Sequence, residues 1–253
     1  MILFGQISGK DALEYKFDAK FSIKSNSFSP GYCIYENEQT TLITSQAPEE
    51  FSQFTYGLTP FWASKKITIF DAPVDGDVPT YPPKNKLHKR IIQMPAFRKP
   101  IREQRCLIPV DYFIVSENGE AYIFYTHSSK PFAIAGVYDH WKLTIRDEIL
   151  TTGFCPLTVP QIYDYNLQIR RFPVILPPKY YKTWLKKDIP LNEVTNLIDF
   201  YNGNDLIGYP IESHLITKRI NDERIIRPIG EPVFTKANDS KNILSYLKNI
   251  KRA

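Results

Sequence analysis

The side chains of this 253-residue chain that could act as nucleophiles or transfer protons are widely separated. The cysteines are Cys33, Cys106 and Cys155, and the histidines are His88, His127, His140 and His214. The chain has no CxxC, GxGxxG, GxxxxGK[ST], HExxH or GxSxG motif. The sequence therefore predicts neither a metal site, nor a nucleotide-cofactor site, nor the nucleophile elbow of a serine hydrolase. A buried cysteine usually acts as a small hydrophobic residue, although Cys106 follows Arg102 and Arg105, which would lower a thiol pKa if the side chains met.

A second set of candidates is a run of basic side chains. From Lys84 to Arg105 eight residues are positive and only Glu103 is negative, so the run carries 8 − 1 = +7, although the whole chain is only +5 (32 − 27). Such a run is commonly a solvated face, and it also has the composition of a wall that binds a phosphate backbone. Lys89 and Arg90 belong to a Pro- and Lys-rich stretch of little periodicity at about 71–95, for which we predict a long loop.

The elements that must position these groups are mainly strands. A chain with 43% hydrophobic and 23% charged residues is globular, and 16 Tyr, 16 Phe and 20 Pro against 11 Gly favour strands with stiff connections. We predict one α+β domain spanning 1–253, with a strand-rich, mostly antiparallel core and flanking helices. We expect strands at Cys33–Tyr35, Thr41–Thr44, Glu50–Gly57, Cys106–Val115, Ala121–Tyr125, Phe132–Tyr138 and Phe154–Val159.

Apolar spacing also predicts four helices, which we expect at Asp11–Phe21, Lys179–Lys187, Leu191–Tyr201 and Asp239–Lys251. Asn118-Gly119 between two strand-like runs predicts a tight hairpin. The sequence has no run of 18 apolar residues and no signal-peptide pattern. It therefore predicts neither a membrane-spanning helix nor a secreted protein. Together with three isolated cysteines, this predicts a cytoplasmic protein. The sequence leaves the oligomeric state open, with a monomer as the default.

Five sequence blocks, in order, resemble the SRAP family of SOS-response-associated peptidases or abasic-site-processing proteins, in a divergent, Bacteroidetes-like form. Together they span nearly the whole chain. They are Tyr56-Gly57-Leu58-Thr59-Pro60-Phe61-Trp62, Pro95-Ala96-Phe97-Arg98 with Arg105-Cys106-Leu107-Ile108-Pro109-Val110-Asp111, Phe132-Ala133-Ile134-Ala135-Gly136-Val137 with Trp141, Arg171-Phe172-Pro173-Val174-Ile175-Leu176 with Trp184-Leu185, and Tyr209-Pro210-Ile211 with Asn221-Asp222.

The resemblance implies a DNA damage response function. Members recognise abasic sites in single-stranded DNA, and a cysteine at position 2 forms a thiazolidine crosslink with the ring-opened sugar. A thiol and an amine on one residue can close a ring on an aldehyde, and this product outlasts a Schiff base. A glutamate and a histidine in later motifs would move protons.

At each of these positions the sequence departs from the family pattern. Position 2 is Ile2, the glutamate position aligns with Val115 and the histidine position with Ile169. The family's N-A-R-x-E motif aligns with Asp71-Ala72-Pro73-Val74-Asp75. Because aliphatic side chains cannot carry protons, we predict that this chemistry is lost and that Ile2, Val115 and Ile169 contact one another.

Several positions of the DNA-binding motifs are kept. The resemblance implies a nucleic-acid interface, and we assign to it Trp62, Asp71, Lys89, Arg90, Phe97, Arg98 and Arg171, although aromatic residues at Trp62 and Phe97 are equally common in cores. The first hypothesis is non-covalent binding of single-stranded or damaged DNA. The alternatives are an active abasic-site enzyme with Cys33 or Cys106 as a replacement nucleophile, and a protein-interaction scaffold.

Overall fold

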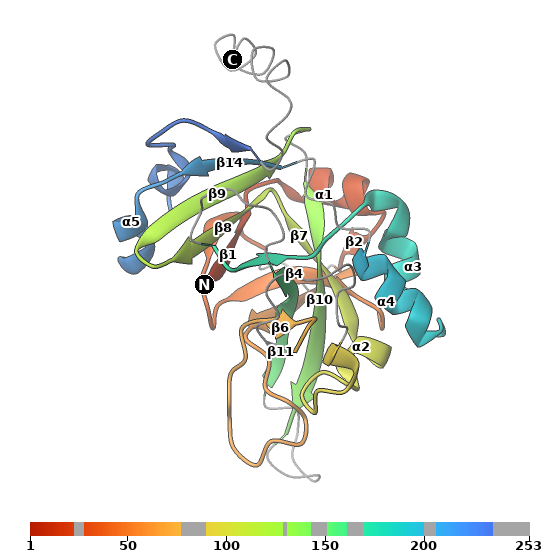
Figure 1. Cartoon of the computed structure of the whole chain (residues 1–253). Coiled ribbons are helices and arrows are strands. Elements are labelled where there is room, and N and C mark those ends of the chain that lie inside the picture. Colours follow the sequence, from red (N-terminus) through yellow and green to blue (C-terminus); the bar gives the residue numbers. More distant parts are fainter. Residues whose placement is uncertain are drawn as a thin grey trace.

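A closed ring of five strands forms the centre of the fold. The computed structural model describes residues 1–22, 28–76, 90–128, 131–142, 151–160, 169–199 and 206–234. The strands of the ring follow the order β11-β10-β7-β4-β5, and a parallel pairing of β5 with β11 closes it. Their bounds are β4 Gln39–Thr44, β5 Glu50–Tyr56, β7 Arg105–Val110, β10 Phe132–Trp141 and β11 Thr151–Pro160 (Figure 1).

Short strands extend this barrel. β2 (Lys20–Phe21) adds to β5, whereas β6 (Ala72–Pro73) and β12 (Arg171–Pro173) add to β11, and β13 (Ile175–Leu176) adds to β10. The stretch 71–95 is thus not loop throughout, because Ala72–Pro73 pairs with β11 and Arg90–Ile92 forms a 3-10 turn. Residues 77–89, with Lys89 among them, lie outside the described part of the chain.

A second sheet packs beside the barrel. Its order is β15-β14-β9-β8-β1-β3, and the pairings within it are antiparallel. The bounds are β1 Ile2–Gln6, β3 Gly31–Ile34, β8 Tyr112–Glu117, β9 Glu120–Thr126, β14 Leu206–Pro210 and β15 Val233–Phe234. The predicted hairpin joins β8 to β9, and Asn118 and Gly119 both have positive φ, 52° and 84°, as a tight primed turn requires.

The prediction of one strand over Cys106–Val115 is wrong, because the chain passes there from the barrel into the second sheet. β7 ends at Val110 and β8 starts at Tyr112. The residue between them, Asp111, accepts hydrogen bonds through its carboxylate from the amides of Ile7 (2.7 Å) and Ser8 (2.8 Å). This side-chain acceptor fixes the end of β1 at the crossing point.

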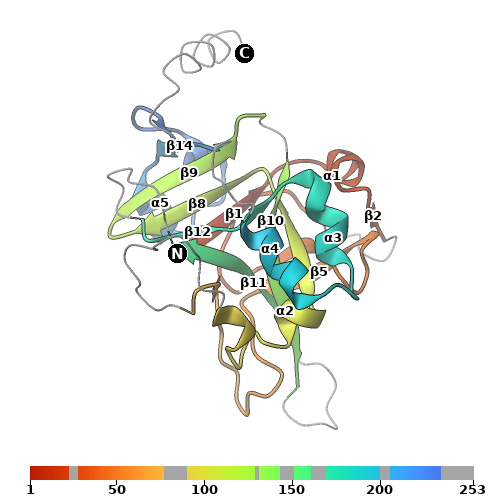
Figure 2. The same cartoon turned by 45° about the vertical axis from the view of Figure 1, so that its right-hand side comes forward.

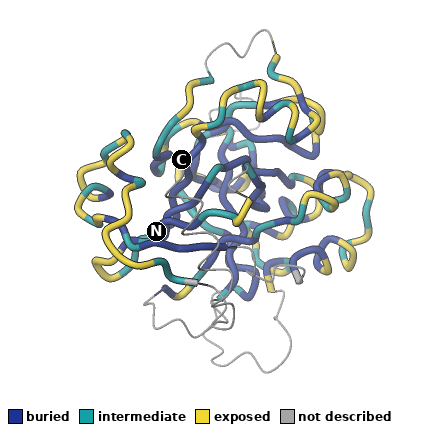
Figure 3. The backbone as a smooth tube through the Cα atoms, turned by 90° about the horizontal axis from the view of Figure 1, so that it is seen from above, coloured by how far each residue is buried: buried dark blue, intermediate teal, exposed yellow. Residues whose placement is uncertain are grey.

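Two hydrophobic clusters fill the interior. Figure 3 shows the buried stretches of the chain gathered in the middle of the molecule. Because strand side chains alternate between faces, Ile108 lies in the cluster between barrel and second sheet, whereas Leu107 lies in the cluster under the helices. Figure 2 shows the helices gathered over one side of the barrel. They are α1 Lys10–Phe17, α2 Pro100–Glu103, α3 Tyr181–Leu185 and α4 Leu191–Asp199.

Three of the predicted helices are present in the described residues, with different bounds. α1 ends at Phe17, before the predicted end at Phe21, because Asp18 takes a left-handed conformation (φ 53°) and the chain turns into β2. α3 is preceded by a 3-10 turn at Pro178–Tyr180. Near the end of the described chain, α5 (Ser213–Thr217) and a 3-10 turn (Glu223–Ile226) pack against the second sheet. The helix predicted at 239–251 lies outside the described residues.

Among the described helices, none is long and apolar enough to cross a membrane.

Candidate functional site

The three positions that align with the family's catalytic residues lie in the cluster between barrel and second sheet. Ile2 on β1 is the direct cross-strand partner of Val115 on β8. Ile169 belongs to the same buried cluster, and the three residues are only 7%, 2% and 4% exposed. The expected contact is thus confirmed for Ile2 and Val115, which are paired directly. Ile169 lies in the same buried cluster, and its contact with the other two stays a prediction.

Polar contacts around Ile2 fix its backbone. The Tyr56 hydroxyl donates to the Ile2 carbonyl at 2.8 Å, and the Ser116 amide donates to the Met1 carbonyl at 2.9 Å. Phe4 and Phe154 pack their rings against Tyr56, with centroid distances of 5.0 and 5.4 Å. Position 2 is therefore a well-packed core position.

All three cysteines are free thiols and buried. Burial raises the pKa of Cys33 to about 12 and raises the pKa of Cys106 and of Cys155 well above the usual range. The Arg105 guanidinium does not offset this for Cys106, because it donates to the carbonyls of Ile101 (3.0 Å) and of Trp184 (2.8 Å). The thiolate form needed for attack on an aldehyde is disfavoured at each position.

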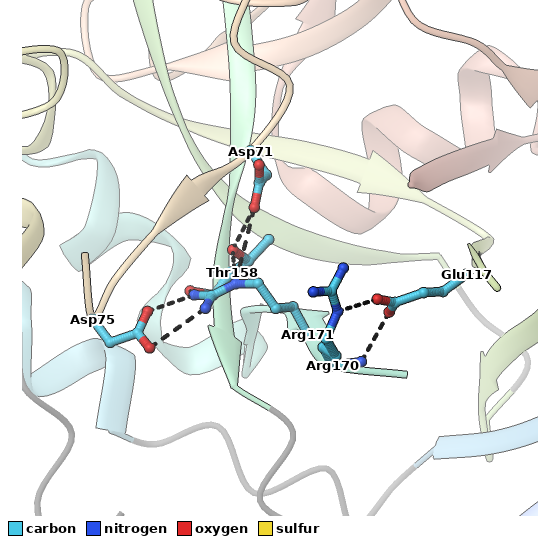
Figure 4. A network of polar contacts seen from close by, with 6 residues as sticks. All are labelled: Asp71, Asp75, Glu117, Thr158, Arg170 and Arg171. Carbon is cyan, nitrogen blue, oxygen red and sulfur yellow. Dashed lines mark hydrogen bonds and ion pairs between the residues drawn. The ribbon is translucent and has the colours of Figure 1, made fainter. Parts of the chain in front are cut away.

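A polar network lies where the aligned motif segments meet (Figure 4). Arg171 on β12 donates through Nη2 to Oδ1 of Asp75 at 2.7 Å and through Nε to the Thr158 hydroxyl at 2.9 Å. The Thr158 hydroxyl in turn donates to Asp71 at 3.0 Å, and the Asp71 carboxylate lies 4.0 Å from Arg171 Nε. The Asp75 side chain is 5% exposed and that of Asp71 is 46% exposed. Arg171 is thus matched by an internal carboxylate, and Asp71 faces solvent beside it.

A neighbouring ion pair was not anticipated from the sequence. The backbone amide of Arg170 donates to Glu117 at 2.9 Å, and its guanidinium also pairs with this carboxylate. Glu117 ends β8, two residues after Val115, and Arg170 follows Ile169 (Figure 4). This pair therefore caps the surface edge of the apolar cluster that holds Val115 and Ile169.

Two exposed aromatic side chains stand on the loop after β5. Phe61 is 46% and Trp62 is 50% exposed. The Trp62 indole donates to the Pro95 carbonyl at 3.1 Å, and the Lys99 ammonium lies 4.6 Å from the centroid of the Phe61 ring. We call Phe61 and Trp62, with the loop 59–66 that carries them, the aromatic platform. The sequence reasoning selected Trp62 and missed Phe61, whose signal was a second aromatic residue directly after a proline.

Basic residues lie on the platform loop and on the segment 95–102, which contacts it through Pro95 and Lys99. The exposed ones on the two adjoining segments are Lys65, Lys66, Arg98 and Arg102, and Lys99 is half-buried against Phe61. Bases can stack on exposed rings while cations neutralise the phosphates, which is the usual way of holding a single strand. Arg90 is also exposed and lies beside Gly76.

Two members of the basic, aromatic stretch are structural residues. Phe97 is 2% exposed and packs in the cluster under the helices, so assigning it to base stacking is wrong for this conformation. Arg105 is completely buried, and its donors are taken up by backbone carbonyls. The +7 of the run thus overstates the charge that reaches the surface.

The sequence comparison decides the family. A family model described as SOS response associated peptidase (SRAP) matches residues 4–218. This chain is a member of the SRAP family. The SRAP match covers both sheets up to α5 and includes the aromatic platform and the Arg171 network.

Individual relatives are distant. The chain is 24% identical to the abasic site processing protein YoaM of Bacillus subtilis (strain 168) over 232 residues, covering 88% of this chain and 96% of YoaM. It is 25% identical to the B. subtilis abasic site processing protein YobE over 219 residues, covering 83% and 93%.

Two crystal structures share the fold of this chain. A Bacteroides thetaiotaomicron protein superposes with a TM-score of 0.72 at 21% identity, covering 90% of this chain and 99% of that one. A Bordetella bronchiseptica protein gives a TM-score of 0.63 at 19% identity, with 83% and 99% covered. At these identities the likeness establishes a shared fold.

Proposed function

We propose that this SRAP protein binds single-stranded or damaged DNA non-covalently and has lost the abasic-site crosslinking expected of its relatives. The observation that carries the proposal is the burial of Ile2 against Val115. A side chain without a thiol, packed against another without a carboxylate, offers neither a nucleophile nor a base. Ile169 completes an apolar environment in which a charged intermediate would be costly.

The aromatic platform supports DNA binding. Its rings are exposed, and its loop is short and held at both ends, because the Thr59 hydroxyl donates to the Ile67 carbonyl at 2.7 Å. Stacking on an exposed ring contributes about 1–3 kcal/mol per base and tolerates any sequence. The surrounding lysines and arginines would make binding salt-dependent, since phosphate contacts release counterions.

The Arg171 network bears on which part of the surface takes phosphate. Arg171 already has Asp75 at 2.7 Å, and Asp71 adds a second negative charge beside it. A phosphate placed there would meet repulsion from Asp71 and would have to compete with Asp75. We therefore assign phosphate binding mainly to the basic residues near the platform. Repulsion by Asp71 would keep phosphates away from Arg171.

A replacement thiol enzyme is the weaker candidate, because each cysteine is buried and its pKa is raised. A scaffold that binds only proteins is the third candidate, and exposed aromatic and basic residues are also common in protein interfaces, so the salt dependence of oligonucleotide binding decides between this and DNA binding. We also propose a cytoplasmic, monomeric protein, in keeping with three free thiols.

The test uses the native chain and a single-stranded oligonucleotide with one abasic site. We expect a mobility shift that weakens as salt is raised, and no adduct on a denaturing gel. Trp62→Ala should reduce the shift, whereas Tyr15→Ala, at a 94% exposed position on α1, should leave it unchanged. A denaturant-stable adduct that disappears when thiols are blocked would overturn the loss of chemistry, and absence of any salt-sensitive shift would favour the scaffold.

A further inference from the structure

We propose that Asp139 is a positioning residue for the aromatic platform: its carboxylate and the indole of Trp141 hold the loop on either side of Trp62. The effect of Asp139 on DNA binding rests on the proposed function. Its effect on the conformation of the loop does not.

The contacts of Asp139 converge from three segments. Asp139 lies on β10 and is 1% exposed. Its Oδ2 accepts the backbone amide of Phe61 at 2.9 Å, and its Oδ1 accepts the amide of His140 at 2.8 Å and the Gln104 side-chain amide at 3.3 Å. The carboxylate therefore has donors on both oxygens, one of them from the platform loop.

The second anchor comes from the same face of β10. Trp141 is two residues after Asp139, so their side chains project to the same side of the strand. The Trp141 indole donates to the Ala63 carbonyl at 2.8 Å. Phe61 is thus held through its amide and Ala63 through its carbonyl, and Trp62 is the residue between them. One strand grips the loop immediately before and immediately after the exposed indole.

Burying a carboxylate this deeply carries a desolvation cost. Desolvation raises the pKa of Asp139, while the Phe61 and His140 amides, Gln104 and the positive charge of Lys99 oppose the rise. Two of these compensating groups, the Phe61 amide and Lys99, belong to the platform or lie against its ring. Binding a strand to mobile rings would require ordering them first, and a loop fixed in advance avoids that loss of entropy.

Asparagine cannot reproduce the arrangement. Its amide nitrogen would face a donor, either the Phe61 amide or those of His140 and Gln104, because an asparagine offers only one oxygen. Asp139→Asn keeps the size of the side chain and should still loosen the loop. Asp111→Asn is the matched control, since Asp111 accepts two backbone amides in the same way at the end of β1, away from the platform.

The primary measurement is the time-resolved fluorescence anisotropy of Trp62, which is 50% exposed whereas Trp141 and Trp184 are 6% and 0% exposed. The full chain is used, with Trp62→Phe as the baseline. We expect Asp139→Asn to increase the fast depolarisation of Trp62 and to weaken binding of a single-stranded oligonucleotide at least threefold. Asp111→Asn should change neither, even where it lowers the melting temperature equally.

The outcomes separate the two proposals. Unchanged Trp62 anisotropy in folded Asp139→Asn overturns the positioning role, whatever the stability. If Asp139→Asn changes the Trp62 anisotropy, the positioning role is supported. If, in addition, neither Asp139→Asn nor Trp62→Ala changes the oligonucleotide affinity, the platform is overturned as the DNA surface. Asp139→Ala is the second variant, and its fast depolarisation of Trp62 should match or exceed that of Asp139→Asn.

Discussion

Ile2 lies directly opposite Val115 in the antiparallel pairing of β1 with β8, and both side chains are almost completely buried. The strand register thus determines the surroundings of position 2, where the family resemblance implies a thiol. The two side chains pack together in the interior, so the same pairing that holds the N-terminal strand in the sheet also buries position 2.

The first prediction concerns this pair. Ile2→Ala should lower the free energy of unfolding by about 2–4 kcal/mol, because it removes buried methyl groups and leaves a cavity. Val115→Glu should lower it by more, since a carboxylate there would be buried without a partner. Chemical denaturation measures both. Tyr15→Ala serves as the surface control, and an equally small change in all three variants would contradict the packing described for Ile2.

The second prediction concerns Arg171 and Asp75. Asp75→Ala should destabilise the protein by roughly 3 kcal/mol, because Arg171 would keep a largely buried charge without its closest partner. Lys182→Ala breaks an ion pair with Asp18 whose side chains are 88% and 80% exposed, and it should change stability by less than about 1 kcal/mol. Thermal or chemical unfolding of the two variants gives the comparison, and equal effects would show that Asp75 is not needed to balance Arg171.

The third prediction concerns thiol reactivity. With a pKa of about 12, Cys33 should carry roughly a thousandfold less thiolate at pH 8 than an ordinary cysteine. Because the folded-state pKa is raised, the neutral thiol persists as pH rises and ionises only near pH 12. A colourimetric disulfide reagent should therefore react slowly with the native protein and with three thiols after unfolding in guanidinium. One fast native thiol would revive the replacement-nucleophile alternative.

The fourth prediction tests the platform ring by ring. Phe61→Ala and Trp62→Ala should each weaken binding of a single-stranded oligonucleotide by about 1–3 kcal/mol, which is roughly 5- to 150-fold. Phe97→Ala should instead lower stability, because its ring is in the core. Fluorescence polarisation at two salt concentrations measures the affinities. Affinity that survives both ring deletions would move the interface elsewhere.

The fifth prediction follows from the raised pKa of Asp139. The folded protein holds a proton there at pH values where the unfolded chain, with an ordinary pKa of 3.8, has lost it. The contribution of Asp139 to stability is therefore fully present below 3.8 and is lost as pH rises through the folded-state pKa. The stability difference between native protein and Asp139→Asn should shrink over that window. A difference that is independent of pH would mean that Asp139 titrates normally.

Much of the fold could be predicted from local patterns. Aromatic and β-branched runs identified the barrel strands, and Asn118-Gly119 identified a hairpin because few other pairs tolerate two positive φ values. The break at Asp111 could not be predicted. The residues around it are apolar without interruption, and the crossing between sheets depends on the amides of Ile7 and Ser8, which are far away in the sequence.

The candidate site was predicted less completely. The family blocks selected Ile2, Val115 and Ile169, which the fold gathers into one buried cluster. The sequence could not distinguish Phe97, which is buried, from Trp62, which is exposed, because both are aromatic residues beside basic ones. Likewise, Arg105 and Arg98 look alike in a charge count, and only the carbonyls of Ile101 and Trp184 distinguish a structural arginine from a surface one.

The pairing of β1 with β8 also means that β1 is synthesised long before its partner strand. Met1 and Ser116 are hydrogen-bonded neighbours that lie 115 residues apart in the chain. At ribosomal rates of 5–20 residues per second, β8 emerges roughly 6 to 23 seconds after β1. During that interval β1 has no partner on the side that β8 later occupies. The pairing that buries Ile2 against Val115 can therefore form only after synthesis has passed Ser116.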